Sequence, residues 1–248
     1  MSYRGVTVTL PAGLAGFNGS RNQSRLEASE LSFVEGIDID GGVIRKEGGA
    51  SKYSSALGAP SKVLAGINWQ ASSAQRYDVV FLDNGSVLRD DGDSTFSVTL
   101  ASGLTVNDEP PPVFVEGGGE TVGDSPSLFM FSAGNQVQVV DGTGSSFGAI
   151  NDPPADWASS QFPKFGVLHA GRLWGGGNDS DPHRIYYSDT GDHQDFATTG
   201  GTLAIFPGEG QGLVGGISFQ GLLILFKFPL GVYVVDTRDP TISNWTVN

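Results

Sequence analysis

The sequence predicts an all-β protein of the β-propeller kind, with about four recognisable four-stranded blades after an irregular N-terminal arm. Three observations carry this prediction. An apolar run that ends in a Gly-containing corner and continues as a second apolar strand occurs four times, at intervals of roughly 40–50 residues, which is typical of propeller blades. The chain of 248 residues contains 37 glycines and 13 prolines, a density that favours many tight turns. No window shows an apolar stripe of helical period and length.

Residues 1–60 do not follow the repeat and are predicted to form an N-terminal arm or clasp. The alternation of residues 6–10 favours a short strand, and residues 37–40 favour another. Gly41 and Gly42 then fit a two-residue hairpin corner, from which residues 43–46 return. Residues 26–31 are polar enough to form a turn or a single helical turn.

Residues 61–248 are predicted to form the propeller, and each blade is assigned from its apolar runs. The expected strands are 63–67, 77–82, 86–89 and 96–100 in the first blade; 112–115, 128–131, 137–141 and a segment reaching 147 in the second; 163–168, 172–174 and 184–188 in the third; and 213–218, 222–227, 231–236 and 245–247 in the fourth. The Pro-rich segments 108–112 and 151–157 mark crossings between blades, because proline donates no hydrogen bond to a strand ladder. Four blades are the lower limit for a closed ring, so the ring is either small or completed by another segment or chain.

The net charge of −13 argues against sequence-independent binding to nucleic acid, since such a surface repels the phosphate backbone. The charge is explained first by solubility, which we favour. The alternative is a specific role, in which an acidic wall lets DNA pass without sticking. The chain has no cysteine, which excludes disulfides and thiolate chemistry. No secretory signal is visible at the start, and the longest apolar run, residues 221–226, is far too short to span a bilayer.

The polar residues offer weak site candidates, each with a structural alternative that we favour. Three histidines, His169, His183 and His193, lack the spacing of a metal pair and are expected to have structural or solvent roles. Oxygen ligands for Ca²⁺ could come from four carboxylates in acidic turns, Asp179, Asp181, Asp189 and Asp192, although aspartates commonly cap turns by bonding their own backbone. Most strand aromatics are expected to fill the core between blades, namely Trp69, Trp174, Tyr186, Phe219, Phe226 and Tyr233.

No catalytic residue and no cofactor site can be defended, and the chain is expected not to be an enzyme. Residues 187–191 are similar to the Asp-box turn of sialidase-like propellers, but Tyr187 stands where that turn has serine, and no second copy occurs. A sialidase also needs an arginine cluster and a tyrosine nucleophile. Arg172 and Arg184 lie near this stretch, but nothing in the sequence pairs them with a nucleophile.

The order of several segments resembles the phage tail nozzle or packaged-DNA stabilisation β-propeller family, the tail tube proteins of short-tailed phages. The matching stretches are residues 22–26 with 41–49, residues 169–174, residues 184–192, residues 219–227 and residues 232–235. They occur in the family's order with similar gaps, and together they span most of the chain from residue 22 to residue 245. Proteins of that family are commonly much longer.

The resemblance implies a virion structural protein of a phage tail, assembled in the host cytoplasm. It implies a homo-oligomeric ring, usually of six identical subunits, below the portal and its adaptor, that retains and conducts DNA through its lumen during ejection. In that setting Arg25, Arg45 and Lys46 of the arm are the candidate contacts to a neighbouring subunit or to other tail proteins. The sequence leaves two alternatives open: a glycan-binding propeller of a host-recognition device, and behind it a sialidase-like hydrolase.

Overall fold

The computed structural model describes two units of the chain, divided between Lys52 and Tyr53. The described residues are 62–90, 95–107, 109–118, 126–142, 144–157, 161–208, 210–229 and 231–248, together with the strand backbones 16–17, 30–31, 37–40 and 43–46. Among them, no helix is long and apolar enough to cross a membrane.

The described part of the first unit consists of four short strands. The strands β1 (Gly16–Phe17) and β2 (Glu30–Leu31) pair in parallel. The strands β3 (Ile37–Asp40) and β4 (Val43–Lys46) pair antiparallel and confirm the predicted hairpin. The strand predicted at residues 6–10 lies outside the described residues.

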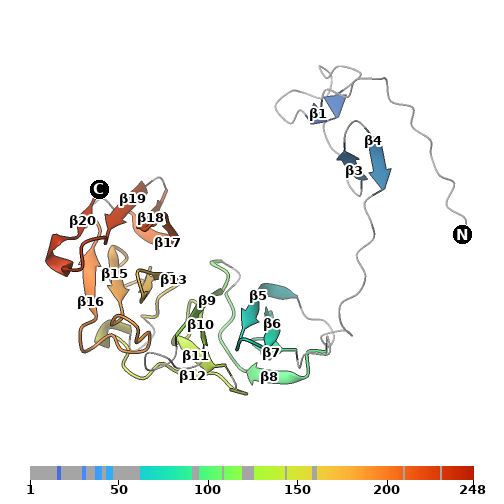
Figure 1. Cartoon of the computed structure of the whole chain (residues 1–248), viewed down its shortest axis with the longest axis horizontal. Helices are drawn as coiled ribbons and strands as arrows, with labels where there is room; N and C mark the ends of the chain where they lie inside the picture. The colour runs from blue at the N-terminus through green and yellow to red at the C-terminus, as the bar shows by residue number, and fades with distance from the viewer. Residues whose placement is uncertain are drawn as a thin grey trace, which may run out of the picture. The chain divides into compact units, whose positions relative to one another are not determined.

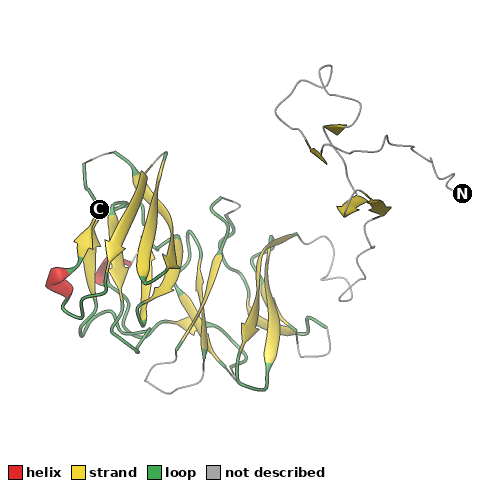
Figure 2. Ribbon diagram, turned by 45° about the horizontal axis from the view of Figure 1, so that its top comes forward, coloured by secondary structure: helices red, strands yellow, loops and turns green. Residues whose placement is uncertain are grey.

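The second unit contains four antiparallel four-stranded sheets, which confirms the predicted propeller-like fold (Figures 1 and 2). Blade 1 comprises β5 (Val63–Gln70), β6 (Arg76–Leu82), β7 (Val87–Arg89) and β8 (Val98–Ala101). Blade 2 comprises β9 (Val113–Gly117), β10 (Ser127–Phe131), β11 (Gln138–Asp141) and β12 (Gly148–Ala149). Blade 3 comprises β13 (Phe165–His169), β14 (Arg172–Gly176), β15 (Arg184–Tyr187) and β16 (Gly201–Ala204). Blade 4 comprises β17 (Gly212–Phe219), β18 (Leu222–Phe228), β19 (Gly231–Asp236) and β20 (Thr246–Val247).

The four corner motifs of the sequence are two different hairpins of the blade, not four copies of one. In blades 1 and 2 the corner glycines, Gly85 and Gly134, connect the second strand to the third. In blades 3 and 4 the corners connect the first strand to the second. There both corner residues have positive φ, 51° and 71° at Ala170 and Gly171 and similar values at the corresponding pair in blade 4, as a tight two-residue turn requires.

The blades follow one another along an arc in which their first strands lie side by side (Figure 1). Strand β5 lies next to β9, β9 next to β13, and β13 next to β17. Among the described residues, β17 has no comparable contact with β5, so the arc does not close on itself. We call the face of a blade that points toward the preceding blade in the chain its back, and the opposite face its front. The front of blade 4 is therefore the face that points away from blade 3, and the back of blade 1 is the face that points away from blade 2.

Each pair of successive blades encloses a hydrophobic core between one front and one back. Trp69, Val79 and Phe81 of blade 1 pack against Leu128 and Met130 of blade 2. Phe129 and Phe131 on the front of blade 2 meet the back of blade 3. On the front of blade 3, Phe165 and Trp174 meet Leu223 and Leu225. Strand alternation explains this arrangement, because successive residues of a strand point to opposite faces of the sheet.

The Pro-rich crossings lie where the sequence predicts them, between the last strand of one blade and the first strand of the next. The segment after β12 also forms a short 3-10 helix, η2 (Ala155–Trp157), whose Trp157 is buried against Tyr186 and Phe196. A linker that leaves a blade therefore also contributes to the core between blades 2 and 3.

Candidate functional site

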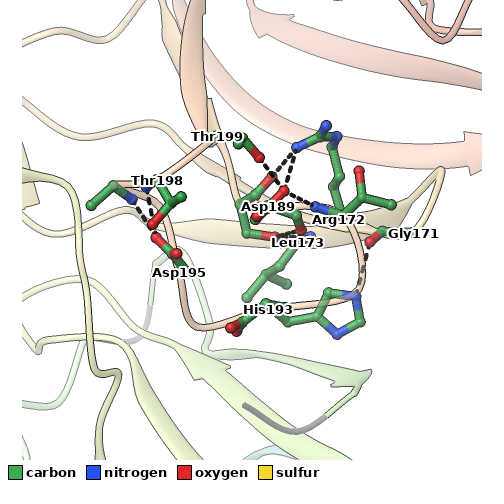
Figure 3. Close-up of polar contacts among 12 residues, drawn as sticks. Gly171, Arg172, Leu173, Asp189, His193, Asp195, Thr198 and Thr199 are labelled. Atoms are coloured by element: carbon green, nitrogen blue, oxygen red, sulfur yellow. Dashed lines mark hydrogen bonds and ion pairs between the residues drawn. The ribbon is translucent and has the colours of Figure 1, made fainter. Parts of the chain in front are cut away.

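A group of polar contacts surrounds the corner of β13–β14 and the turn after β15 (Figure 3). Arg172 donates through Nη1 to the backbone oxygen of Ser188 at 2.6 Å and lies 3.9 Å from Asp189 Oδ1. The hydroxyl of the buried Ser188 accepts a bond from the Leu173 amide at 2.9 Å. These contacts fasten the turn after β15 to β14.

Asp189 and Asp195 act as turn caps in this group. Asp189 Oδ1 accepts the amide of Thr190 at 2.6 Å and the hydroxyl of Thr199. Asp195 Oδ1 accepts the amides of Ala197 and Thr198, and the bonds from Thr198 lower the pKa of this carboxyl below its usual value. Such side-chain bonds to nearby backbone are the ordinary means by which aspartate stabilises a turn. The Asp-box-like stretch is therefore a structural turn.

His193 joins blade 2 to blade 3. Its Nε2 donates to the oxygen of Gly171 at 3.2 Å, and its Nδ1 accepts the amide of Gly118. Burial lowers the pKa of this ring. An amide can donate only to an unprotonated ring nitrogen, so the contact with Gly118 also requires the neutral form. The histidine is held as a fixed bridge between two sheets.

His169 joins blade 3 to blade 4 in a similar manner. Its Nδ1 lies 2.8 Å from Ser218 Oγ and its Nε2 lies 2.7 Å from Thr237 Oγ1. The ring is buried, and burial lowers its pKa. His183 lies between the same blades, with Nδ1 3.4 Å from Nζ of the buried Lys227. All three histidines thus contact the neighbouring blade.

We expect the protein to lose stability as the pH falls below about 6.5, the ordinary pKa of histidine. In that range the unfolded chain binds protons at these rings, whereas the buried rings of His169 and His193 stay neutral to a lower pH. Because the unfolded state then binds more protons, acidification lowers the free energy of unfolding until the pH passes the lowered native pKa values. Thermal unfolding at about pH 7.5 and about pH 5.5 measures this loss. The double variant His169→Gln/His193→Gln should show a smaller drop in Tm than the wild type, and an equal drop would contradict the assignment.

The four carboxylates suggested for Ca²⁺ are engaged separately. Asp179 pairs with Lys164, and Asp181 Oδ2 lies 2.8 Å from Arg184 Nη2. Asp192 accepts the amide of Gln194 at 3.1 Å, and Asp189 has the contacts described above. Across the described ranges, no three His, Asp or Glu side chains form a group that could hold a metal ion.

We therefore expect the Tm of the purified protein to be unchanged by adding millimolar Ca²⁺ or by treating it with a chelator. A bound ion that recognises only the folded state would raise the Tm by mass action. A reproducible increase with Ca²⁺ that EDTA reverses would show that carboxylates outside the described contacts form a site.

Arg172 and Arg184 do not converge. Arg172 is the first residue of β14 and lies near Tyr187, the last residue of β15. Its guanidinium is 5.5 Å from the centre of the Tyr187 ring. Arg184 begins β15 at the opposite end of the β14–β15 ladder and lies 3.0 Å from Asp156. The Tyr186 hydroxyl donates to the same carboxylate at 2.9 Å, and burial raises the pKa of this phenol. The arginine cluster that a sialidase requires is not formed by these two residues.

A glycan-binding propeller needs exposed aromatic side chains, and Trp174 is not available at the surface. Trp174 is completely buried between blades 3 and 4, where its ring contacts Tyr187 and Trp245 and its Nε1 donates to the oxygen of His169 at 3.0 Å. A small apolar cleft of about 160 Å³ lies elsewhere, beside Trp157 and Pro154. Its walls offer few polar groups to orient a sugar.

The candidate interface residues of the arm fall where side chains are not described. Arg45 and Lys46 belong to β4, for which the structure gives only the backbone, and Arg25 lies outside the described residues. Sequence reasoning missed a different surface. Phe219 and Phe226, expected in the core, are 54% and 38% exposed on the front of blade 4.

The fold and the site together define a β-propeller-like protein whose described histidines, arginines and acidic turns are used to join strands and blades. The chain matches no protein-family model, and no curated protein matches its sequence.

Proposed function

We propose that this protein is a structural component of a phage tail, part of the ring-forming nozzle or tail tube below the portal and adaptor. The observation that carries the proposal is the structural use of the polar residues around blade 3. His169 and His193 bridge blades, and Arg172 and Arg184 hold turns and linkers. Such a set of contacts supports a rigid scaffold better than a site that binds and converts a substrate.

The segments that resemble the tail propeller family support the proposal because they fall at structural positions. Residues 169–174 form the corner of β13–β14, and residues 219–227 form the corner of β17–β18 with most of β18. These are the hairpins from which blades 3 and 4 are built. In the proposed role, rigid blades hold the shape of the ring, and the arm contacts neighbouring subunits or tail proteins.

The charge of the chain fits a passage for DNA rather than a binding site for it. With a net charge of −13, the protein should not retain duplex DNA at low salt, where attraction between a protein and the phosphate backbone is strongest. A gel-shift assay at about 50 mM salt measures this property. Tight, salt-sensitive binding would contradict a passive channel.

Imaging of the virus particles tests the proposal. Electron cryomicroscopy of virions should show the blades as a ring in the tail, on the side of the portal and adaptor away from the head, and mass spectrometry of purified particles should detect the chain. Absence of the protein from purified virions that are intact and infectious would overturn the proposal.

A further inference from the structure

The front of blade 4 is an apolar sheet face that no other described part of the chain covers. Because Leu223, Leu225 and Val235 face blade 3, the alternate residues of the same strands face away from it. These alternate residues on β17, β18 and β19 are Ile217, Phe219, Leu222, Ile224, Phe226, Phe228, Val232 and Val234. Phe228 is 71% exposed, Val232 64% and Ile217 50%, whereas the fronts of blades 1, 2 and 3 are buried under the next blade.

The back of blade 1 carries the matching half of a contact that the protein makes twice elsewhere. On the back of blade 3, Gly166 has no Cβ, and Phe131 of blade 2 fills the space, its Cε2 only 2.1 Å from the position that a Cβ would take. On the back of blade 4, the Cβ position of Gly216 lies 2.9 Å from Leu225 of its own blade and 3.5 Å from Phe165 of blade 3. Gly66 is the corresponding glycine on β5, and it contacts only its own blade.

Among the described residues, nothing covers either face, and the two faces are both apolar at one end. Val63 begins β5 on the back of blade 1 and is 45% exposed, and Phe228 lies opposite the first residue of β17 on the front of blade 4. Val63 and Phe228 therefore both lie at the end of the sheet where the first strand of the blade begins. At the other end, Arg76 of blade 1 donates to Gln70 at 3.1 Å, and Asp236 of blade 4, which lies opposite Leu222, is paired with Arg238. Polar groups near that end are already satisfied, since Asn68 donates to Asp78 at 2.8 Å.

We propose that a second copy of this chain covers these faces, with the front of blade 4 in one copy packed on the back of blade 1 in the other. The contact is the fourth use of the front-on-back packing that already joins blades 1 to 2, 2 to 3 and 3 to 4. Phe226 or Phe228, near the end of β18, then enters the space above Gly66, as Phe131 at the end of β10 enters the space above Gly166. Two copies related by a two-fold axis make the contact twice and close a ring of eight blades, within the range of known propellers.

The area of the exposed face argues for closure and against a simple face-to-face pair. Strands β17, β18 and β19 have 8, 7 and 6 residues. At about 3.3 Å per residue and about 4.8 Å between strands, their face measures roughly 320 Å². A single contact removes about 640 Å² from both copies, less than a stable interface needs, whereas the two contacts of a closed pair remove about 1,300 Å² and reach the standard size.

This inference concerns how one propeller is completed and does not depend on the tail function. It says nothing of how completed propellers would be arranged around a tail axis. A protein that is absent from virions could still close an eight-bladed ring, and a virion component could prove to be monomeric in solution, so the two proposals fail separately.

Light scattering coupled to gel filtration tests the inference on the purified full chain at micromolar concentrations. We expect a mass of twice 25.9 kDa for the wild type. Phe226→Glu alters the front of blade 4, and Gly66→Trp fills the space on the back of blade 1. Each variant alone should be a monomer, because both residues are exposed in a single chain. Gly66 does not have positive φ, but a Cβ there would lie 3.2 Å from the backbone oxygen of Val79, so circular dichroism must first show that Gly66→Trp is folded. An equimolar mixture of the two should associate only weakly, because its one unaltered contact buries less area than a stable interface needs.

Phe206→Glu is the matched control, since Phe206 is 43% exposed but lies outside the proposed contact, after β16. This variant should remain a dimer. A monomeric wild type would overturn the inference. So would loss of the dimer in Phe226→Glu but not in Gly66→Trp, which would indicate that two fronts of blade 4 pair with each other. A mass above two chains would show that the copies join without closing.

Discussion

Replacing Phe131 by alanine is expected to lower the free energy of unfolding by about 3–5 kcal/mol, the usual cost of removing a fully buried phenylalanine. The side chain is completely buried between blades 2 and 3, where its ring lies 6.4 Å from that of Trp157 and covers Gly166 and Gly175. The glycines cannot fill the space, so alanine leaves a cavity. Since most domains are stable by only about 5–15 kcal/mol, this change should be visible as a large shift of the urea midpoint.

Phe228→Ala serves as the matched control for this prediction. It removes the same atoms from a side chain that is 71% exposed, so the loss should be within about 0.5 kcal/mol for the monomeric protein. Both variants are best compared at a concentration where neither associates. Similar losses at the two positions would mean that the core between blades 2 and 3 does not determine stability.

The second large effect is expected from Gly166→Ala, a change of a single methyl group. A Cβ at this position would lie 2.1 Å from Cε2 and 2.4 Å from Cζ of Phe131. Because the ring is enclosed and close-packed, it cannot move away freely, and overpacking of this kind costs about 1–3 kcal/mol. Chemical denaturation of the variant measures the loss.

Phe131→Leu in the Gly166→Ala background tests whether the loss comes from this contact. The shorter side chain gives the added methyl group room, so the double variant should lose less than the two single variants together. Gly148→Ala is the control, because nothing lies within 4 Å of the Cβ at that exposed position. Additive losses in the double variant would contradict the proposed clash.

Local sequence patterns predict most strands because these strands alternate apolar residues and end at Gly- or Asp-containing corners. The predicted segment 231–236 matches β19 from Gly231 to Asp236. Strand β16 escaped prediction because Gly201–Ala204 contains little of this pattern and is defined by its pairing with β15. The predicted strand ranges place the corners in two different hairpins, 77–82 with 86–89 in blade 1 and 163–168 with 172–174 in blade 3, and the pairings of β6 with β7 and of β13 with β14 confirm both.

Local sequence patterns could not predict the histidine bonds between blades or the exposed front of blade 4, because both depend on residues far apart in the chain. His169 bonds Ser218 and Thr237, which lie 49 and 68 residues further along the chain, and no local pattern pairs them. Alternation shows that Phe219 and Phe226 share one face of a sheet with other apolar residues. It does not show whether another sheet covers that face, which only the arrangement of the blades reveals.

A high-resolution structure of the purified full chain, in which the blades around the central channel are counted, tests the account most directly. We predict eight blades contributed by two chains, with blade 4 of each chain packed on blade 1 of the other and a phenylalanine of β18 over Gly66. A ring closed within one chain, or a front of blade 4 covered by the chain's own N-terminal residues, would contradict the account.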